Sequence, residues 1–346
     1  MRFAVIGAGT IGQLRAQSIK ANPNTELIGV ADPTIAQAER AVAGSGAKAL
    51  SDWRAALELP GVEAVMVSSP IQFHEEAVVA ALKAGLHVLC EKPMSNTVES
   101  CRRMLDAGRA SGRTLATGFN HRYYPAMKFL KQAVDDGRIG TVDHVRIFGG
   151  HDGLHNFRAD WQYKAPVSGG GAMMDVGIHM TDLARFVLGE VSEVYGVASN
   201  RVFQVPGSED NAVAIFKSPS GIAATYQATW TEWKGYRFYV EVYGDKGMVR
   251  GYYAPMQNLL VTQDQPGGAR KRIRKLYPEI MIREKLKSWT STALLSFQDE
   301  LVDFLRMVKG EKTNLADGVA GFRAVEMANA VYQSSQTGQP VTLAKL

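Results

Sequence analysis

Cysteine and long hydrophobic runs are scarce in this chain of 346 residues. The two cysteines, Cys90 and Cys101, are too few for a disulfide framework, and their number favours a reducing compartment. No apolar run reaches the ~18 residues that a membrane-spanning helix needs. The first residues, MRFAVIGAGTIG, do not show the basic, apolar and small-residue regions of a secretory signal. We therefore expect a cytoplasmic location and no membrane partner.

The chain also lacks a strong excess of charge, internal repeats and low-complexity segments. Its 39 Lys and Arg against 34 Asp and Glu give a formal net charge of +5, which suits an acidic small ligand but gives little support for nucleic-acid binding. The composition, 46% hydrophobic and 21% charged, is that of an ordinary globular protein. A chain of this length is expected to form about two domains with sizeable cores.

Strands and helices alternate along the first third of the chain. Continuous apolar strands separated by helices predict a parallel sheet that is covered on both faces. The predicted fold class is therefore α/β, with an N-terminal doubly wound Rossmann domain over residues 1–121. The predicted strands are 2–6, 26–32, 47–50, 63–69, 86–92 and 113–120, and the predicted helices are 34–43, 73–84 and 97–111.

After residue 121 the pattern changes to one helix followed by many short strands. Connections rich in Gly, Pro, Ser and Asp predict a large, mostly antiparallel sheet. Several strands alternate apolar and polar residues, so one sheet face is expected to be covered and the other free to contact a second copy. Residues 122–346 are thus predicted to form an α+β domain for substrate binding and oligomerisation, in a homodimer or homotetramer. Its strand-like runs are 142–150, 192–202, 211–218, 221–230, 236–244 and 246–253, with helices near 124–137, 295–309 and 317–335.

The sequence Gly7-x-Gly9-x-x-Gly12 follows the first predicted strand and opens a helix. In the dinucleotide-binding fingerprint the first glycine allows the tight turn, the second lets the backbone approach the pyrophosphate, and the third lets helix and strand pack closely. The helix N-terminus, at Thr10 and Ile11, supplies N–H groups and a favourable dipole for phosphates. The turn is therefore predicted to hold a dinucleotide.

Asp32 stands at the end of the second predicted strand, about 20 residues after Gly12, as the fingerprint requires. A carboxylate there accepts hydrogen bonds from the ribose hydroxyls and repels a 2′-phosphate. Pro33 and Thr34 follow it, with no adjacent arginine for that phosphate. The predicted cofactor is therefore NAD, and NADP is disfavoured.

Two further motifs carry chemistry. Glu91-Lys92-Pro93 ends an apolar run, and ligands of doubly wound sheets bind at the carboxyl ends of the strands, so Lys92 is interpreted as a catalytic lysine. The stretch SGGGAMMDVGIHMTDLARFVLG is predicted to form a helix after its glycine run, with Asp175, His179 and Asp182 spaced i, i+4 and i+7 on one face. An acid one turn before His179 makes that histidine a candidate acid–base group.

Gly177 lies inside this predicted helix, between Asp175 and His179. A glycine there costs roughly 1 kcal/mol of helix stability relative to alanine. That cost indicates that some other group needs close access to the helix backbone.

Together, the glycine fingerprint, Glu-Lys-Pro at 91–93 and the motif that carries Asp175 and His179 resemble the glucose–fructose oxidoreductase/inositol dehydrogenase/rhizopine catabolism (Gfo/Idh/MocA) family. The resemblance covers nearly the whole chain, including the order of the two domains. SSPIQFHEE resembles the family's Thr-Pro-Asn-x-x-His loop, with Ile71 in place of the usual asparagine, and GFNHRYYPA resembles the family's crossover segment.

The resemblance implies an NAD(H)-dependent oxidoreductase that transfers hydride between nicotinamide and a secondary alcohol of a sugar, sugar acid or cyclitol. Lys92 and His179 would face the reacting hydroxyl, whose proton must leave with the hydride. His179 is assigned as the general acid–base group, with Asp175 orienting it or contacting a substrate hydroxyl. Lys92 is assigned to stabilise negative charge on the oxygen, and an exchange of roles between Lys92 and His179 is an open alternative.

Two sets of binding residues complete the predicted site. The resemblance implies the cofactor contacts beyond the fingerprint: Ser69, Pro70, His74, Glu91, Lys92 and Asn120. A loop segment after residue 150 is added to the substrate contacts because it runs from a strand toward the Asp175 helix and sets an aromatic beside an arginine. The predicted substrate contacts are Lys92, Arg122, His151, Arg158, Trp161, Asp175 and His179.

Weaker patterns are interpreted conservatively. His151-Asp152-x-x-His155 could supply metal ligands, but no cysteine or third histidine is nearby, and hydride transfer with a lysine needs no metal, so none is expected. The basic run ARKRIRK, residues 269–275, is predicted to be a solvated surface, with an anionic substrate tail or a subunit contact as alternatives. No recognised nucleic-acid motif accompanies it.

Two other classes of function stay open. One is an NAD-dependent glycosidase, which would oxidise, eliminate and re-reduce its substrate with no net redox change. The other is a non-catalytic NAD-binding regulator, against which the complete set of Lys92, Asp175 and His179 argues.

Overall fold

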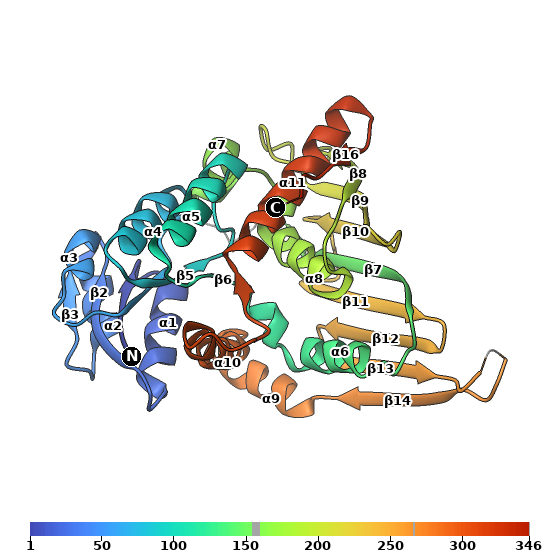
Figure 1. Ribbon diagram of the computed structural model, residues 1–346, viewed down its shortest axis with the longest axis horizontal. Coiled ribbons are helices and arrows are strands. Elements are labelled where there is room, and N and C mark those ends of the chain that lie inside the picture. Colours follow the sequence, from blue (N-terminus) through green and yellow to red (C-terminus); the bar gives the residue numbers. More distant parts are fainter. Residues whose placement is uncertain (154–159, 266, 346) are drawn as a thin grey trace. The chain divides into compact units, whose positions relative to one another are not determined.

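The structure is a computed structural model that describes residues 1–153, 160–265 and 267–345. It divides into two compact units (Figure 1). The first unit comprises Met1–Tyr123 and Arg283–Phe322, and the second comprises Tyr124–Ile282 and Arg323–Leu346. In the described part of the chain, no helix is both long and apolar enough to cross a membrane.

The first unit is built on a seven-stranded sheet of order β15-β6-β5-β4-β1-β2-β3. Every pair of neighbours is parallel except β15–β6. The strands are β1 (Arg2–Ile6), β2 (Glu26–Ala31), β3 (Lys48–Leu50), β4 (Ala64–Val67), β5 (His87–Glu91), β6 (Leu115–Gly118) and β15 (Ala316–Asp317). The helices are α1 (Thr10–Ala21), α2 (Ile35–Val42), α3 (Trp53–Leu57), α4 (His74–Lys83), α5 (Val98–Ser111) and α10 (Thr290–Val308), with short 3₁₀ turns η1 (Ile71–Phe73) and η2 (Asn120–Tyr123).

The second unit is built on a nine-stranded sheet of order β14-β13-β12-β11-β7-β10-β9-β8-β16. All neighbours are antiparallel except β7 and β10. The strands are β7 (Val142–Gly150), β8 (Glu193–Ser199), β9 (Asn211–Lys217), β10 (Ala223–Thr229), β11 (Arg237–Gly244), β12 (Gly247–Tyr253), β13 (Gln257–Thr262), β14 (Lys271–Leu276) and β16 (Val341–Thr342).

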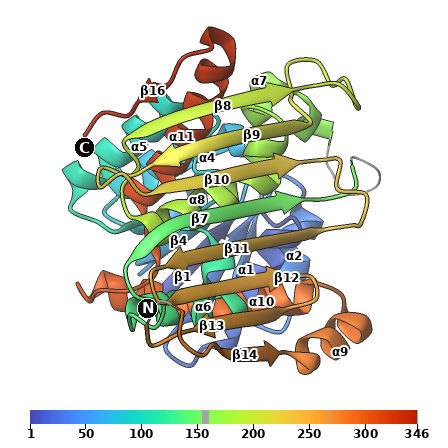
Figure 2. The same cartoon turned by 90° about the vertical axis from the view of Figure 1, so that its right-hand side faces the viewer.

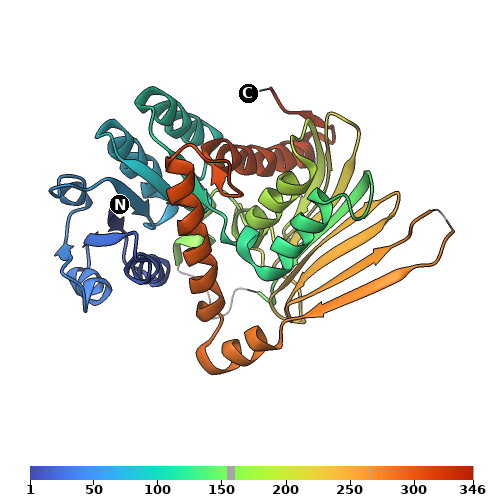
Figure 3. The ribbon, with the colours of Figure 1, turned by 60° about the horizontal axis from the view of Figure 1, so that its bottom comes forward.

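Helices cover one face of this second sheet. They are α6 (Pro125–Asp135), α8 (Ile178–Leu188) and the later part of α11 (Gly318–Thr337), and Figure 2 looks onto the opposite face of the sheet. The remaining elements of the unit are short: η3 (Asp160–Tyr163), α7 (Ala165–Ser168) and the π-helical η4 (Met173–Gly177). β14 runs into α9 (Pro278–Lys287), which leads on to α10 of the first unit (Figure 3).

The predicted fold class is confirmed, and the strands of the first domain lie where the apolar runs placed them. The division of the chain differs in one respect, because residues 283–322 pack with the first unit although the sequence-based boundary placed them in the second. The physical reason is the apolar face of α10, which joins the first core through Leu301 and Phe304 beside Phe3. An amphipathic pattern shows that a helix is covered, but not which sheet covers it.

Candidate active site

The glycine turn after β1 has the shape that the fingerprint predicts. Gly7 has φ 90°, and a Cβ there would lie 2.6 Å from the backbone nitrogen of Ser69. A Cβ on Gly12 would lie 1.9 Å from the carbonyl oxygen of Gly7, so neither position accepts a side chain. A Cβ on Gly9 would meet nothing within 4 Å. The turn is therefore tight against β4 but open at Gly9, where the N-terminus of α1 begins at Thr10.

Asp32 is fixed over this turn by two backbone donors. The N–H of Ala8 donates to Oδ2 at 2.7 Å, and the N–H of Thr34 donates to Oδ1 at 2.8 Å. Each carboxylate oxygen has a second lone pair, so both can still accept a hydrogen bond from a ribose hydroxyl. The residues present fit a dinucleotide with an unphosphorylated adenosine ribose. The hydroxyl oxygens of Ser68 and Ser69, beside Gly7, add polar capacity, since they have no hydrogen-bond partner among the described residues.

His74 lies between the turns that follow β4 and β5. Its buried ring places Nε2 2.8 Å from the carbonyl oxygen of Ser69, and Nδ1 3.1 Å and 3.3 Å from those of Pro93 and Met94. Burial lowers the pKa of His74, against weaker opposing effects that include these carbonyl oxygens and Glu91. Both ring nitrogens face backbone carbonyl oxygens, so His74 links the Ser69 turn to the Pro93 turn, and its contact with the cofactor stays a prediction.

Lys92 follows the last residue of β5, at the carboxyl edge of the first sheet. Glu91 is held from beneath by Arg15, whose Nε donates to its Oε1 at 2.6 Å. Burial and, to a smaller extent, the Lys92 cation hold the pKa of His121 well below its usual value, so His121 is a neutral neighbour of Lys92 that the sequence did not reveal. The predicted contacts Ser69 and Pro70 lie at the same edge, after β4.

Asn120 and Arg122 lie on η2, and both are anchored to the C-terminal part of the first unit. The side-chain amide of Asn120 donates to the hydroxyl of Ser296 at 2.8 Å, and Nη1 of Arg122 donates to the carbonyl oxygen of Asn314 at 3.0 Å. Both side chains are buried. Their backbone is therefore fixed by α10 and the loop that follows it.

In the second unit, Asp175 lies in the π turn η4 and His179 in the first turn of α8. The π turn was not predicted, and such turns are frequent at functional sites. Glu209 holds its start: the N–H groups of Gly171 and Met173 donate to the two carboxylate oxygens at 2.8 and 2.6 Å. A Cβ on Gly171 would lie 1.9 Å from the carbonyl oxygen of Glu209. The glycine run of the motif thus admits a buried acid that no sequence pattern identified.

Gly177 ends the π turn, and its role is close packing on β10. A Cβ there would lie 2.4 Å from the hydroxyl oxygen of Tyr226 and 2.7 Å from Cβ of Ala228. The Tyr226 hydroxyl donates to the carbonyl oxygen of Gly177 at 2.9 Å, and the Thr181 hydroxyl donates to the same oxygen at 3.0 Å. The group that needs close access to the backbone is therefore the sheet itself.

Asp175 accepts two hydrogen bonds on one oxygen, Oδ2. Nε2 of His151 lies 2.9 Å away and Nε1 of Trp230 lies 3.0 Å away. The N–H of Gly153 donates to Nδ1 of His151 at 3.3 Å, which assigns the ring proton to Nε2 and makes His151 a donor to the carboxylate. His151 and Trp230 directly follow the paired parallel strands β7 and β10, so the sheet brings them together. The structure thus gives His151 a supporting role under Asp175.

Two predicted substrate residues, Arg158 and Trp161, belong to the segment after residue 150. Trp161 is half-buried on η3, and Arg158 lies outside the described residues. Within residues 1–153, 160–265 and 267–345, no three His, Cys, Asp or Glu side chains are grouped as a metal site would need.

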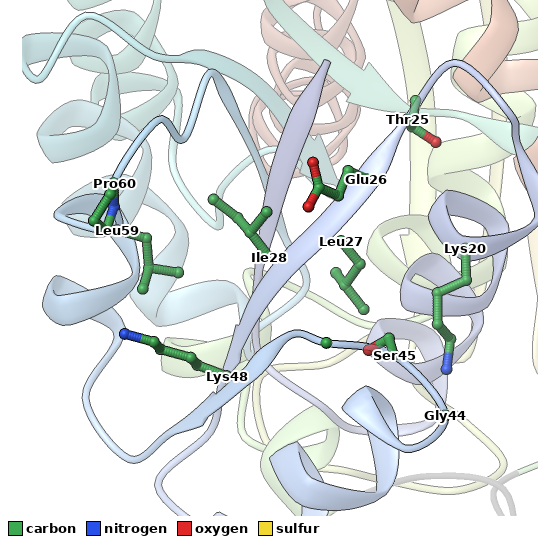
Figure 4. Close-up of a pocket in the computed structure, with 11 residues that line it drawn as sticks. Lys20, Thr25, Glu26, Leu27, Ile28, Gly44, Ser45, Lys48, Leu59 and Pro60 are labelled. Atoms are coloured by element: carbon green, nitrogen blue, oxygen red, sulfur yellow. The ribbon is translucent and has the colours of Figure 1, made fainter.

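A cavity of about 490 Å³ lies in the first unit at the amino ends of the strands, away from the carboxyl ends where the glycine turn and Asp32 lie (Figure 4). Lys20, Glu26, Ser45, Lys48 and Pro60 are among the residues that line it. These residues surround the amino ends of β2 and β3, whereas Asp32 follows the carboxyl end of β2. The cavity is therefore separate from the cofactor edge.

Comparisons with known proteins cover nearly the whole chain. A model described as an oxidoreductase family with an NAD-binding Rossmann fold matches residues 1–119, and a Gfo/Idh/MocA C-terminal domain model matches residues 127–250. The uncharacterized oxidoreductase YrbE of Bacillus subtilis is 30% identical over 347 residues, which is 98% of this chain and 95% of that protein. Myo-inositol 2-dehydrogenase of Thermotoga maritima is 29% identical, over 99% of this chain and 98% of the relative.

A solved structure of a probable dehydrogenase from Thermotoga maritima is 29% identical and superposes with a TM-score of 0.80, covering 99% of this chain and 98% of the other. Two family models and relatives that cover nearly the whole chain therefore point to the same family. The chain belongs to the Gfo/Idh/MocA family of NAD-binding oxidoreductases.

Proposed function

We propose that this protein is an NAD(H)-dependent dehydrogenase that acts on a secondary alcohol group of a sugar, sugar acid or cyclitol. The observation that carries the proposal is Asp175, held by the N–H groups of His151 and Trp230 at the start of the helix that bears His179. Such a fixed carboxylate suits recognition of a hydroxyl group. Relatives named as inositol and levoglucosan dehydrogenases support the choice of a polyhydroxy substrate.

The proposal gives each residue one task. His179 takes the proton of the reacting hydroxyl, because the alcohol cannot release hydride readily while its oxygen stays protonated. Asp175 orients His179 or accepts a hydrogen bond from a neighbouring substrate hydroxyl. Lys92 donates to the reacting oxygen and stabilises its negative charge. The proposal groups Lys92 with Asp175 and His179 because the motifs of the family contain all three residues.

The cofactor residues of the proposal are the glycine turn, the N-terminus of α1, Asp32 and the turns after β4 and β5. When bound, NAD supplies the hydride acceptor. Asp32 holds the ribose hydroxyls and disfavours a 2′-phosphate, so the proposal includes a preference for NAD over NADP. Comparable affinity for NADPH and NADH in a fluorescence titration would contradict that preference.

A screen for NADH production over sugars, sugar acids and inositols tests the activity, with Lys92→Ala and His179→Ala as matched variants. The expected result is turnover of one substrate class that both variants lose. Near-normal turnover in both variants would refute the assignment. Glycoside hydrolysis without net NADH, in a protein that retains NAD, would point to a glycosidase, and NAD binding without turnover would point to a regulator.

We also propose that the open face of the nine-stranded sheet, which is the face that α6, α8 and α11 do not cover, contacts a second copy of the chain. Tyr195 and Val197 on β8 lie opposite Ile215 and Val213 on β9, and all four are exposed large side chains. An exposed apolar patch of this kind is typical of a contact surface. The strands of this face alternate buried and exposed residues, as the sequence pattern predicts.

A further inference from the structure

Three charged side chains form a buried cluster beneath the end of β5, which we call the Arg15 cluster: Arg15 on α1, Glu91 on β5 and Glu300 on α10. Arg15 donates from Nε to Oε1 of Glu91 at 2.6 Å and from Nη1 to Oε2 of Glu300. Its guanidinium also lies 3.8 Å from the ring centroid of Phe297. Arg15 and Glu300 have no exposed side-chain surface, whereas 12% of the Glu91 side chain is exposed.

The cluster is built around this arginine. A Cβ on Gly118 would lie 2.5 Å from Nη2 of Arg15 and 3.2 Å from Oε1 of Glu91, so the last residue of β6 must be glycine for the pair to fit. Nothing in the proposed hydride transfer uses Arg15 or Glu300. Burying these charges is costly and requires a glycine at position 118, so we look for a function of the cluster other than hydride transfer.

The charges in the cluster do not balance, since one guanidinium faces two carboxylates. Oε2 of Glu300 is held by Arg15, but its Oε1 is buried and has no hydrogen-bond partner in the described part of the chain. Protonation at Oε1 would remove the excess charge. Burial raises the pKa of Glu300 to about 7; Glu91 acts in the same direction, while Arg15 and Arg122 oppose it. The nearby Tyr123 hydroxyl donates to Oδ2 of Asp303 at 2.9 Å and stays neutral, because burial raises its pKa.

The strand order places this cluster under the nicotinamide half of the cofactor cleft. A dinucleotide spans the two halves of a doubly wound sheet across the carboxyl ends of the strands. Asp32, after β2, marks the adenosine half, so the ends of β4, β5 and β6 underlie the nicotinamide half. Glu91 is the member of the cluster that reaches the surface there. Oxidised nicotinamide is a cation and reduced nicotinamide is neutral, so the charge on the cluster discriminates between the two forms.

We propose that Glu300 links a proton to the choice between oxidised and reduced cofactor, acting through Arg15 and Glu91. With Glu300 ionised, the cluster carries one excess negative charge and favours the cationic ring; with Glu300 protonated, the cluster is neutral and that preference is lost. By linkage, Glu300 releases its proton when NAD⁺ binds and keeps it when NADH binds. Glu300 is thus a specificity-determining residue for the redox form of the cofactor.

Calorimetric titration of the whole protein with NAD⁺ and with NADH tests this without any turnover. At pH 7, in buffers of different ionisation enthalpy, wild-type protein is expected to release up to about half a proton per NAD⁺ bound, because a group near its pKa is half protonated. From about pH 6 to pH 8 the affinity for NAD⁺ relative to NADH should rise about three- to tenfold. This is the effect expected when one negative charge in a partly buried cluster attracts the cationic nicotinamide ring. Glu300→Gln should lose both effects.

The matched control is Glu311→Gln, which removes an exposed carboxylate that is paired with Arg306. It should keep the proton release and the pH dependence of the wild type. Proton release that survives in Glu300→Gln, or that disappears in Lys92→Met, would assign the proton to another group and overturn the proposal. Infrared difference spectra of wild-type protein test the same step without a substitution. Binding of NAD⁺ should remove a protonated-carboxyl band that NADH leaves in place, and an unchanged band would also overturn the proposal.

Discussion

Replacing Glu300 by glutamine should change how the folding stability of the chain depends on pH. The pKa of Glu300 is raised by burial from an ordinary 4.5 to about 7. A carboxyl group with a raised pKa binds its proton more tightly in the folded than in the unfolded chain. Below about pH 4.5 the carboxyl group is protonated in both the folded and the unfolded chain, so it does not lower the free energy of unfolding. Above about pH 7 it is ionised in both, and the loss of stability is complete.

The size of the effect follows from the same values. The difference between 4.5 and about 7 corresponds to about 3 kcal/mol, since one pH unit is worth about 1.4 kcal/mol per proton. Most of this difference falls between pH 5 and pH 8, where the free energy of unfolding of the wild type should fall relative to that of Glu300→Gln by about 2.5 kcal/mol. Glutamine keeps the shape and one acceptor oxygen for Arg15 but cannot ionise, so its own stability lacks this slope.

Urea unfolding at several values between pH 5 and pH 8, followed by circular dichroism, measures this difference. Groups that the two proteins share cancel in the comparison. Glu311→Gln, which removes an exposed carboxylate, should differ from the wild type by a constant amount within about 0.5 kcal/mol, because exposed ion pairs contribute little. A constant difference for Glu300→Gln, or one that falls as the pH rises, would refute the reasoning from burial.

Three other substitutions test the second unit. Trp230→Phe removes an N–H donor to the Asp175 carboxylate and should lower kcat/KM about tenfold or more, which is the value of a hydrogen bond to a charged group. The control Trp233→Phe, at a tryptophan that is 69% exposed, should leave the kinetics unchanged. Gly171→Ala places a Cβ 1.9 Å from a carbonyl oxygen and should lower the free energy of unfolding by at least about 2 kcal/mol. The control Gly46→Ala, where a Cβ meets nothing within 4 Å, should leave it unchanged, and equal unfolding curves for the two variants would contradict this. Ile215→Lys on the open sheet face should shift the protein toward monomer in size-exclusion chromatography with light scattering, and an unchanged mass would argue against contact through that face.

The first unit was largely predictable because its strands are buried on both faces. Such strands are continuous apolar runs bounded by turns, as in the stretch that ends at Cys90. β14 shows the opposite case: all six of its residues are exposed and most are basic, so nothing in Lys271–Leu276 indicates a strand. A charged edge strand is hidden from pattern analysis because its pairing comes from the neighbouring strand, here β13, and not from its own side chains.

The candidate site divides in the same way. Lys92 and the helix that carries Asp175 and His179 stand in local motifs, so their places at the end of a strand and on a helix could be predicted from the sequence, and the family resemblance supplied their roles. Their supports could not, because Trp230 and Glu209 come from distant strands and loops and meet the helix only once the sheet is assembled. His74 shows a third outcome: its place in the motif was evident, but the direction of its ring nitrogens toward three carbonyl oxygens depends on the fold.

The glycines of the motifs connect the predictable and the unpredictable parts of the site. Gly171 is small because Glu209 lies against it, Gly177 because Tyr226 packs on it, and Gly118 because Arg15 crosses it. In each case the sequence shows that a side chain is excluded, and only the fold shows which group takes the space. Two of these groups are buried carboxylate or guanidinium, which are costly to bury without partners. The glycines therefore mark where buried charged groups lie: Gly118 against Arg15 beneath the end of β5 in one unit, and Gly171 against Glu209 at the start of the Asp175 helix in the other.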